Sequence, residues 1–118
     1  MAGPAADLQA FKAVFFKALA HPVRIRILET LRAGERSVQE LQAALALDQA
    51  VVSQQLAVLR ARNIVSARKE GTTVRYVVRD ALVGDLLDVA RRIFNNQLVG
   101  TQRMLHQLRR EGRRSKGR

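Results

Sequence analysis

Residues 48–62 read Asp-Gln-Ala-Val-Val-Ser-Gln-Gln-Leu-Ala-Val-Leu-Arg-Ala-Arg, and this stretch predicts a short two-faced helix. Val52, Leu56 and Leu59 recur at spacings of four and three, which places them on one helical face. The opposite face carries amide, hydroxyl and guanidinium groups, which can hydrogen-bond to base edges and phosphates. The same pattern also fits an ordinary surface helix with a solvated polar face, so the neighbouring segments have to decide.

A second short helix is predicted immediately upstream, over residues 37–47. Ser37 and Glu40 have the spacing of a capping box, in which each side chain accepts a hydrogen bond from the other residue's amide. Asp48 can then cap the start of the next helix. Two short helices joined by such a tight turn indicate a helix-turn-helix, whose second helix enters the major groove of DNA. The residues that we expect to contact DNA from this helix are Gln49, Ala50, Val51, Ser53, Gln54, Gln55 and Arg60.

After these helices the pattern changes from helical to alternating. Residues 64–69 and 74–79 alternate in part between apolar and polar side chains, and a glycine lies in the turn between them, which predicts an antiparallel hairpin. Its outer face is basic and is expected to hold phosphates beside the second helix. A charged edge that prevents aggregation of the sheet is the alternative, and both roles can coexist. The expected phosphate contacts are Arg68, Lys69, Thr72, Thr73 and Arg75.

The two ends of the chain carry apolar helical patterns that one small domain cannot cover. Residues 8–19 are apolar on several sides, and the helical pattern that runs from Asp80 to about Arg110 has apolar spacings close to a heptad. A helix of about 30 residues spans about 45 Å, so it needs a partner, and the simplest partner is a second copy of the chain. The expected dimerisation residues are Leu8, Phe11, Phe15, Leu82, Leu86, Val89, Ile93 and Leu98.

Length and composition favour a single domain, since 118 residues with 47% hydrophobic side chains suffice for one core. We expect a flexible N-terminus over residues 1–6 and one domain for DNA binding and dimerisation, which contains the helix-turn-helix and the hairpin, over residues 7–110. Residues 111–118 are expected to form a basic, disordered tail. The predicted fold class is mainly α with a small β-hairpin beside a helix-turn-helix, assembled as a homodimer.

The net charge of +11 favours a polyanionic partner. A membrane is the weaker candidate because there is neither an apolar run of about 18 residues nor a signal peptide, so we expect a cytoplasmic, nucleoid-associated protein. The chain has no cysteine, which removes disulfides, thiolate nucleophiles and thiolate metal ligands. No catalytic motif is recognised, so we expect no enzyme activity, no cofactor and no bound metal.

The order of these segments resembles that of the ArsR/SmtB family of winged helix-turn-helix repressors, from about residue 8 to residue 108. The motifs that carry this resemblance are Leu19-Ala20-His21-Pro22-Val23-Arg24-Ile25-Arg26-Ile27-Leu28, Val52-Ser53-Gln54-Gln55-Leu56-Ala57-Val58-Leu59-Arg60 and Arg68-Lys69-Glu70-Gly71. The resemblance implies a dimeric repressor that binds an inverted-repeat operator in double-stranded DNA.

The departures from the family pattern concern metal sensing above all. Metal-sensing members carry a Cys-Val-Cys box where this chain has residues 37–39, Ser-Val-Gln. Their second site uses Asp and His pairs on the last helix. The corresponding residues here are Asp80, Leu82, Ile93 and Asn96, of which only Asp80 could bind metal. A response to thiolate-bound metals is therefore not expected.

Two further departures lie in and after the second helix of the motif. Gln54 and Gln55 stand where members more often have a His pair, which should alter the operator sequence that is recognised. Asn63 stands where members have Gly, and asparagine tolerates the left-handed conformation that a helix end requires.

The sequence is compatible with three functions. The leading hypothesis is a sequence-specific DNA-binding regulator, and the alternative is a sequence-indifferent architectural DNA-binding protein of the nucleoid. Metal sensing through His21, His106 and carboxylates is the third, although His21 before proline is most simply a helix-boundary residue. The small-molecule or protein effector, if there is one, is not indicated by the sequence.

Overall fold

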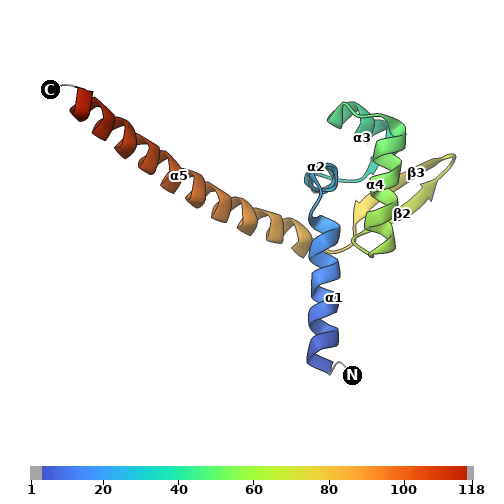
Figure 1. The fold of residues 1–118 in the computed structure, drawn as a ribbon. Helices are drawn as coiled ribbons and strands as arrows, with labels where there is room; N and C mark the ends of the chain where they lie inside the picture. Colours follow the sequence, from blue (N-terminus) through green and yellow to red (C-terminus); the bar gives the residue numbers. More distant parts are fainter. Residues whose placement is uncertain (1–3, 117–118) are drawn as a thin grey trace. The chain divides into compact units, whose positions relative to one another are not determined.

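The computed structural model describes the backbone of residues 4–116 and the side chains of residues 7–113. Its elements are α1 (Pro4–Leu19), α2 (Pro22–Leu31), β1 (Arg36–Ser37), α3 (Val38–Leu45), α4 (Gln49–Ala61), β2 (Val65–Glu70), β3 (Thr73–Val78) and α5 (Leu82–Lys116) (Figure 1). The chain divides into two units, of which the first ends at Gly84 and the second begins at Asp85. The predicted helix-turn-helix and hairpin therefore belong to one unit, and most of α5 forms the other.

The core of the first unit forms where α2, α3 and α4 pack together. The predicted inner face of α4 is buried, because Val52, Leu56 and Leu59 are at most 1% exposed. Opposite these residues, Ile27, Leu28 and Leu31 come from α2, and Leu41 and Leu45 come from α3. The amphipathic pattern of residues 48–62 thus has the orientation that the sequence predicted.

Side chains at the helix ends determine where α2 and α3 begin. The Ser37–Glu40 capping box is confirmed: the Glu40 amide donates to Ser37 Oγ at 3.2 Å, and the Ser37 amide donates to Glu40 Oε1 at 3.4 Å. His21 is the N-cap of α2, and its Nδ1 accepts a hydrogen bond from the Val23 amide at 3.1 Å. The helix-boundary interpretation of His21 is therefore confirmed. Asp48 occupies the N-cap of α4, but its side chain makes no capping hydrogen bond, contrary to the expectation.

Two non-glycine residues adopt left-handed backbone conformations at the ends of short helices. Asn63, with φ of 59°, follows α4 as the sequence predicted. Ala46, with φ of 54°, ends α3 and was not anticipated, since alanine has no preference for this region. The left-handed conformation of an alanine costs about 1 kcal/mol. Tertiary packing must therefore stabilise this turn of the helix-turn-helix.

The hairpin is confirmed and is joined by a strand that the sequence did not predict. All pairing is antiparallel, in the order β1-β3-β2. Glu70 pairs with Thr73, so the turn has two central residues, and Gly71 takes the first position with φ of 62°, as a type II′ turn requires. β1 pairs Arg36 with Tyr76. A strand of two residues is too short for alternation to reveal it.

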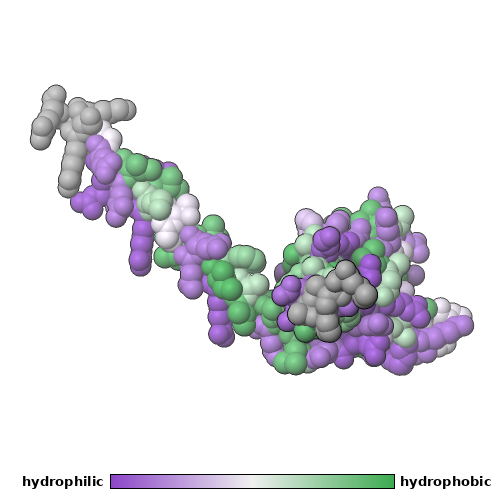
Figure 2. All heavy atoms as spheres, turned by 60° about the horizontal axis from the view of Figure 1, so that its bottom comes forward, coloured by the Kyte–Doolittle hydropathy of each residue, from purple (hydrophilic) through white to green (hydrophobic). Residues whose placement is uncertain are grey.

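The helices at both ends extend further than predicted. α1 already begins at Pro4, within the stretch expected to be loose, and residues 1–3 lie outside the described residues. α5 continues to Lys116, into the stretch expected to be a basic, disordered tail; residues 117 and 118 of that stretch lie outside the described residues. Adding residues to an existing helix avoids the cost of nucleation, and residues 111–116 contain no proline. Figure 2 shows apolar and polar side chains along α5.

None of the helices in the described part of the chain is both long enough and apolar enough to cross a bilayer.

Candidate nucleic-acid interface

The outer face of α4 presents most of the side chains that the sequence assigned to DNA contact. Gln49, Ala50, Ser53, Gln54 and Arg60 are exposed, whereas Val51 and Gln55 are half-buried. The exposed groups include an amide, a hydroxyl and a guanidinium on one side of a helix whose other side is fixed in the core. Such a helix can enter a groove without losing its packing.

The two adjacent glutamines of α4 have different environments. Gln55 Oε1 accepts a hydrogen bond from Arg24 Nη1 of α2 at 2.7 Å. Within the described part of the chain, the Gln54 side chain has no hydrogen-bond partner, so both its donor and its acceptor remain available. Gln54 can therefore pair with a base edge, whereas Gln55 would first have to release Arg24.

Two of the wing arginines are bound to carboxylates of the protein itself. Arg68 Nη2 lies 2.7 Å from Glu35 Oε2, and Arg75 Nη1 lies 3.0 Å from Glu40 Oε1. Arg75 Nη2 also donates to the Glu35 carbonyl at 3.3 Å, and its side chain is only 26% exposed. Arg75 therefore joins β3 to the start of α3 and holds the wing against the helix-turn-helix.

The same contacts stabilise the charged forms of both carboxylates. The hydrogen bond from Arg68 lowers the pKa of Glu35 below its ordinary value. For Glu40, the hydrogen bond from the Ser37 amide and the charge of Arg75 lower the pKa. The Glu40 carboxylate therefore belongs to the capping box of α3 and also binds Arg75 of the wing. This shared residue links the start of α3 to β3.

The remaining wing residues are free for an external anion. Lys69, Thr72 and Thr73 are exposed around the hairpin turn. The side chains of Lys69, Arg60 and Arg62 have no hydrogen bond or ion pair within residues 7–113. These cations can bind phosphate without breaking a contact inside the protein.

A crevice separates α4 from the wing, and the sequence did not predict it. It has a volume of about 460 Å³ and is lined by Ser53, Leu56, Ala57, Arg60, Ala61 and Tyr76. Ser53 and Arg60 come from the face of α4 that was expected to contact DNA, whereas Tyr76 comes from the middle strand, β3. Tyr76 was interpreted only as part of the alternation, because its proximity to α4 depends on how the sheet packs.

The predicted dimerisation residues are mostly exposed in this single chain. In α1, Leu8 is 54% and Phe11 73% exposed, and Phe15 is half-buried with its ring edge-on to Phe16. In α5, Leu82, Val89, Ile93 and Leu98 are between 50% and 68% exposed, and Leu86 is half-buried. Water contact at so many large apolar side chains is unfavourable, and large exposed apolar surfaces are typical of interfaces.

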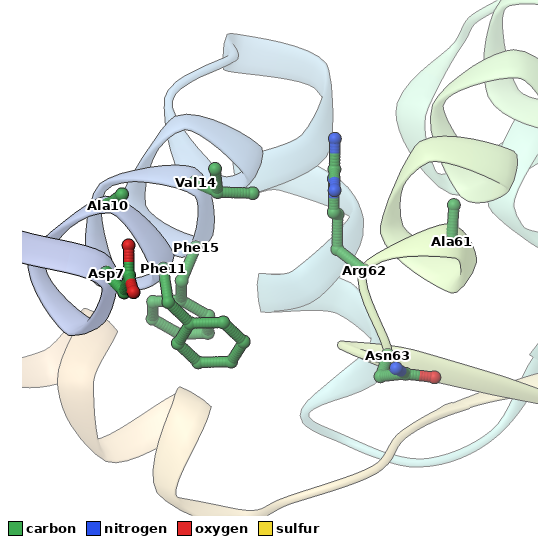
Figure 3. A pocket seen from close by; sticks show the side chains of 8 residues that line it. All are labelled: Asp7, Ala10, Phe11, Val14, Phe15, Ala61, Arg62 and Asn63. Carbon is green, nitrogen blue, oxygen red and sulfur yellow. The ribbon is translucent and has the colours of Figure 1, made fainter. Parts of the chain in front are cut away.

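One part of the α1 surface is hollowed. A groove of about 490 Å³ lies between α1 and the end of α4 and is lined by Asp7, Ala10, Phe11, Val14, Phe15, Ala61, Arg62 and Asn63. Figure 3 shows the two phenylalanines on the α1 side and Arg62 and Asn63 across from them. The groove is apolar along α1 and polar at its α4 edge.

The residues at the family's two metal positions do not fit a metal site. Ser37 is 5% exposed and its hydroxyl caps α3, while Asp80 Oδ1 accepts a hydrogen bond from the Leu82 amide at 2.9 Å. Among the described residues, no group of three or more His, Cys, Asp or Glu side chains is placed to hold a metal ion. The available oxygen donors at these positions are used to begin helices.

A helix-turn-helix with an exposed polar second helix, flanked by a basic antiparallel wing, defines a winged helix-turn-helix DNA-binding protein. The family model of "Bacterial regulatory protein, arsR family" matches residues 21–67. The chain is 42% identical over 106 residues to the uncharacterized HTH-type transcriptional regulator Rv0081 of Mycobacterium tuberculosis, which covers 89% of this chain and 93% of that protein. The chain belongs to the arsR family of bacterial regulatory proteins, a family of transcriptional regulators and not of enzymes.

Solved structures of similar proteins agree with this fold. The crystal structure of Rv0081 covers 83% of this chain and 96% of its own, with a TM-score of 0.73. The solution structure of Mb0332 from Mycobacterium bovis, described as a homodimeric winged helix-turn-helix DNA-binding domain, is 30% identical, with a TM-score of 0.74 and coverage of 83% and 91%. The biofilm growth-associated repressor of Agrobacterium fabrum is 40% identical over 82 residues, or 70% of each chain.

The lowered pKa values of Glu35 and Glu40 predict that the wing contacts weaken in acid. Because the unfolded chain binds these protons more readily, this stabilisation is present above the ordinary value of 4.5 and is lost as the pH falls through the lower folded-state values. The variant Glu35→Gln/Glu40→Gln should have lower stability at neutral pH and a smaller loss of stability between about pH 5 and pH 3. Urea unfolding at several pH values measures this. Glu29→Gln, at an exposed position of α2, is the control, and equal pH dependence of the double variant and wild type would contradict the prediction.

Proposed function

We propose that the protein is a repressor that binds an inverted-repeat operator as a homodimer, with one α4 in the major groove of each half-site. The observation that carries this proposal is the exposed Gln54 amide, which has no hydrogen-bond partner among the described side chains and lies on a helix whose opposite face is buried. A glutamine amide can pair with adenine N6 and N7 at once, which gives sequence specificity. Gln49, Ala50, Val51 and Ser53 accompany Gln54 into the groove.

The remaining contacts in the proposal divide between holding DNA and holding the wing. Arg60, Lys69, Thr72 and Thr73 bind backbone phosphates, since their side chains are exposed beside the groove-facing residues. Arg68 is 55% exposed and can exchange its carboxylate partner for phosphate. Arg75 is the least able of these residues to exchange its carboxylate partners for phosphate. In this proposal it holds the wing in position and does not bind DNA.

The dimer in this proposal forms through α1 and α5. The support is the set of exposed apolar residues on both helices and the homodimeric description of the similar Mb0332 domain. Two copies related by a twofold axis would bury these surfaces and present two identical recognition helices, which matches the symmetry of an inverted repeat. We place the protein in the cytoplasm, associated with the nucleoid.

Substitutions can separate the recognition of bases from sequence-independent binding to phosphates. Gln54→Ala should weaken binding to the cognate operator by about 1–3 kcal/mol and leave binding to scrambled DNA nearly unchanged. Lys69→Ala should weaken both DNAs by similar factors and lower the salt slope by about 0.9 for the lost phosphate contact. Affinities for both duplexes at three salt concentrations test this, with the operator selected by the wild-type protein from random duplexes. Equal loss on both DNAs for Gln54→Ala would favour an architectural protein, which the net charge of +11 also suits.

The dimer can be tested through the apolar side of α5. Ile93→Asp should dissociate the dimer, because it would bury an unpaired carboxylate at a cost of several kcal/mol. Asn95→Asp adds the same charge to an exposed polar position of this helix and should leave the dimer intact. Sedimentation velocity at micromolar concentration measures both. A monomeric wild type, or a fully dimeric Ile93→Asp variant, would show that the interface lies elsewhere.

Regulation in this proposal does not depend on transition metals, because Ser37 and Asp80 cap helices and the chain has no cysteine. Zinc at a stoichiometric concentration should leave the affinity for the operator unchanged, as measured by fluorescence anisotropy with and without chelator. A loss of about tenfold or more that a chelator reverses would contradict this and would direct attention to His106.

A further inference from the structure

The Arg24 side chain connects three helices of the first unit. Its Nε donates to the Ala18 carbonyl at 2.6 Å and its Nη2 to the Lys17 carbonyl at 3.2 Å, both in the last turn of α1. Its Nη1 donates to Gln55 Oε1 in the middle of α4 at 2.7 Å. A planar guanidinium fixes these three directions relative to one another, which a flexible ammonium group could not do.

The contact with α1 lies where the direction of that helix is determined. Among residues 7–19, only Ala18 and Leu19 are buried, so α1 is packed against the unit only at its C-terminal end. The last carbonyls of a helix lack partners within the helix and carry partial negative charge, so a cation placed there is favourable. Arg24 therefore supplies two of the few contacts that hold α1 at a definite angle.

A small change in this angle is large at the far end of the helix. α1 has 16 residues and is about 24 Å long at 1.5 Å per residue. A rotation of about 10° about its C-terminal end would move the other end by about 4 Å, which exceeds the rise of one base pair, about 3.4 Å. If α1 contacts the second copy, its angle helps to set the distance between the two recognition helices.

We propose that Arg24 is a positioning residue for operator recognition: it couples the direction of α1 to α4 and so selects the spacing between half-sites. Gln55 belongs to the same device, as the acceptor that orients Arg24, and does not read bases. This inference rests on the proposed function, because it requires a dimer that binds an inverted repeat.

The test compares operators that differ only in half-site spacing. The probes are the inverted repeat selected by the wild-type protein from random duplexes, the same repeat lengthened or shortened by one and two base pairs, and a single half-site. Arg24→Lys keeps the charge but loses the planar fork, and Gln55→Met removes the acceptor at similar size. Arg26→Lys is the control, since Arg26 lies on the same helix but donates to the Leu45 carbonyl at the end of α3, at 3.0 Å, and not to α1 or α4.

Arg24→Lys and Gln55→Met should lose affinity for the selected operator by about tenfold, equivalent to about 1.4 kcal/mol. Their preference for the selected spacing should become flatter, while affinity for the single half-site and the bases selected within it stay the same. Arg26→Lys should behave as wild type. Circular dichroism and sedimentation establish that each variant is folded and dimeric before binding is compared.

Several outcomes would overturn the inference, and they differ from failure of the proposed function. An equal loss on the half-site and the full operator would make Arg24 a phosphate contact or a purely structural residue. A changed base preference in Gln55→Met would make Gln55 a base-reading residue. A variant that no longer folds or dimerises would show that Arg24 serves stability. If wild type does not distinguish the inverted repeat from scrambled DNA, the proposed function itself fails, and the inference fails with it.

Discussion

Burial of the inner face of α4 is the constraint on which the rest of the interface depends. Val52, Leu56 and Leu59 are at most 1% exposed against α2 and α3, so α4 cannot rotate without removing them from the core. Because a helix has a fixed angular spacing, anchoring these three side chains also determines which groups face outward. Gln54 and Arg60 are exposed for this reason. The hydrophobic core thus determines which side chains of α4 face outward, and the hydrogen bond from Arg24 to Gln55 adds a polar contact at the edge of that face.

Some basic residues of the first unit hold the wing in place, and others remain available to bind phosphate. The net charge does not distinguish these two roles. Arg75 is half-buried between Glu35 and Glu40 and holds the wing in place. Lys69, Arg60 and Arg62, in contrast, have no partner within the described side chains. Ion pairs between exposed groups contribute little stability, but a half-buried arginine that bonds to two elements restricts how they move. The wing is therefore held at its base and free at its tip, which suits a segment that meets a phosphate backbone.

The helices at the two ends of the chain differ from the core helices, because each leaves many apolar side chains exposed within its own unit. Phe11 is 73% exposed and Leu98 is 63% exposed, although each belongs to a helical pattern that would ordinarily indicate a core. A helix of 35 residues has more surface than the second unit can cover by itself. The proposed dimer would bury this exposed apolar surface. The positions of α1 and α5 would then also influence how the dimer binds DNA.

The sequence by itself determined the helices and the hairpin but not the short strand β1, because helical period, capping and turn preference depend only on neighbouring residues. The box at Ser37 and Glu40, the left-handed Asn63 and the hairpin turn at Gly71 were all recognisable in this way, and so was the buried face of α4. Tertiary structure alone decided which polar side chains are available. Gln54 and Gln55 are chemically identical neighbours at different angles of the helix, but the hydrogen bond that occupies Gln55 comes from Arg24, 31 residues earlier. Arg75 is similarly committed by Glu40, 35 residues away. Such pairs arise from the way whole elements pack, and local periodicity carries no information about that packing.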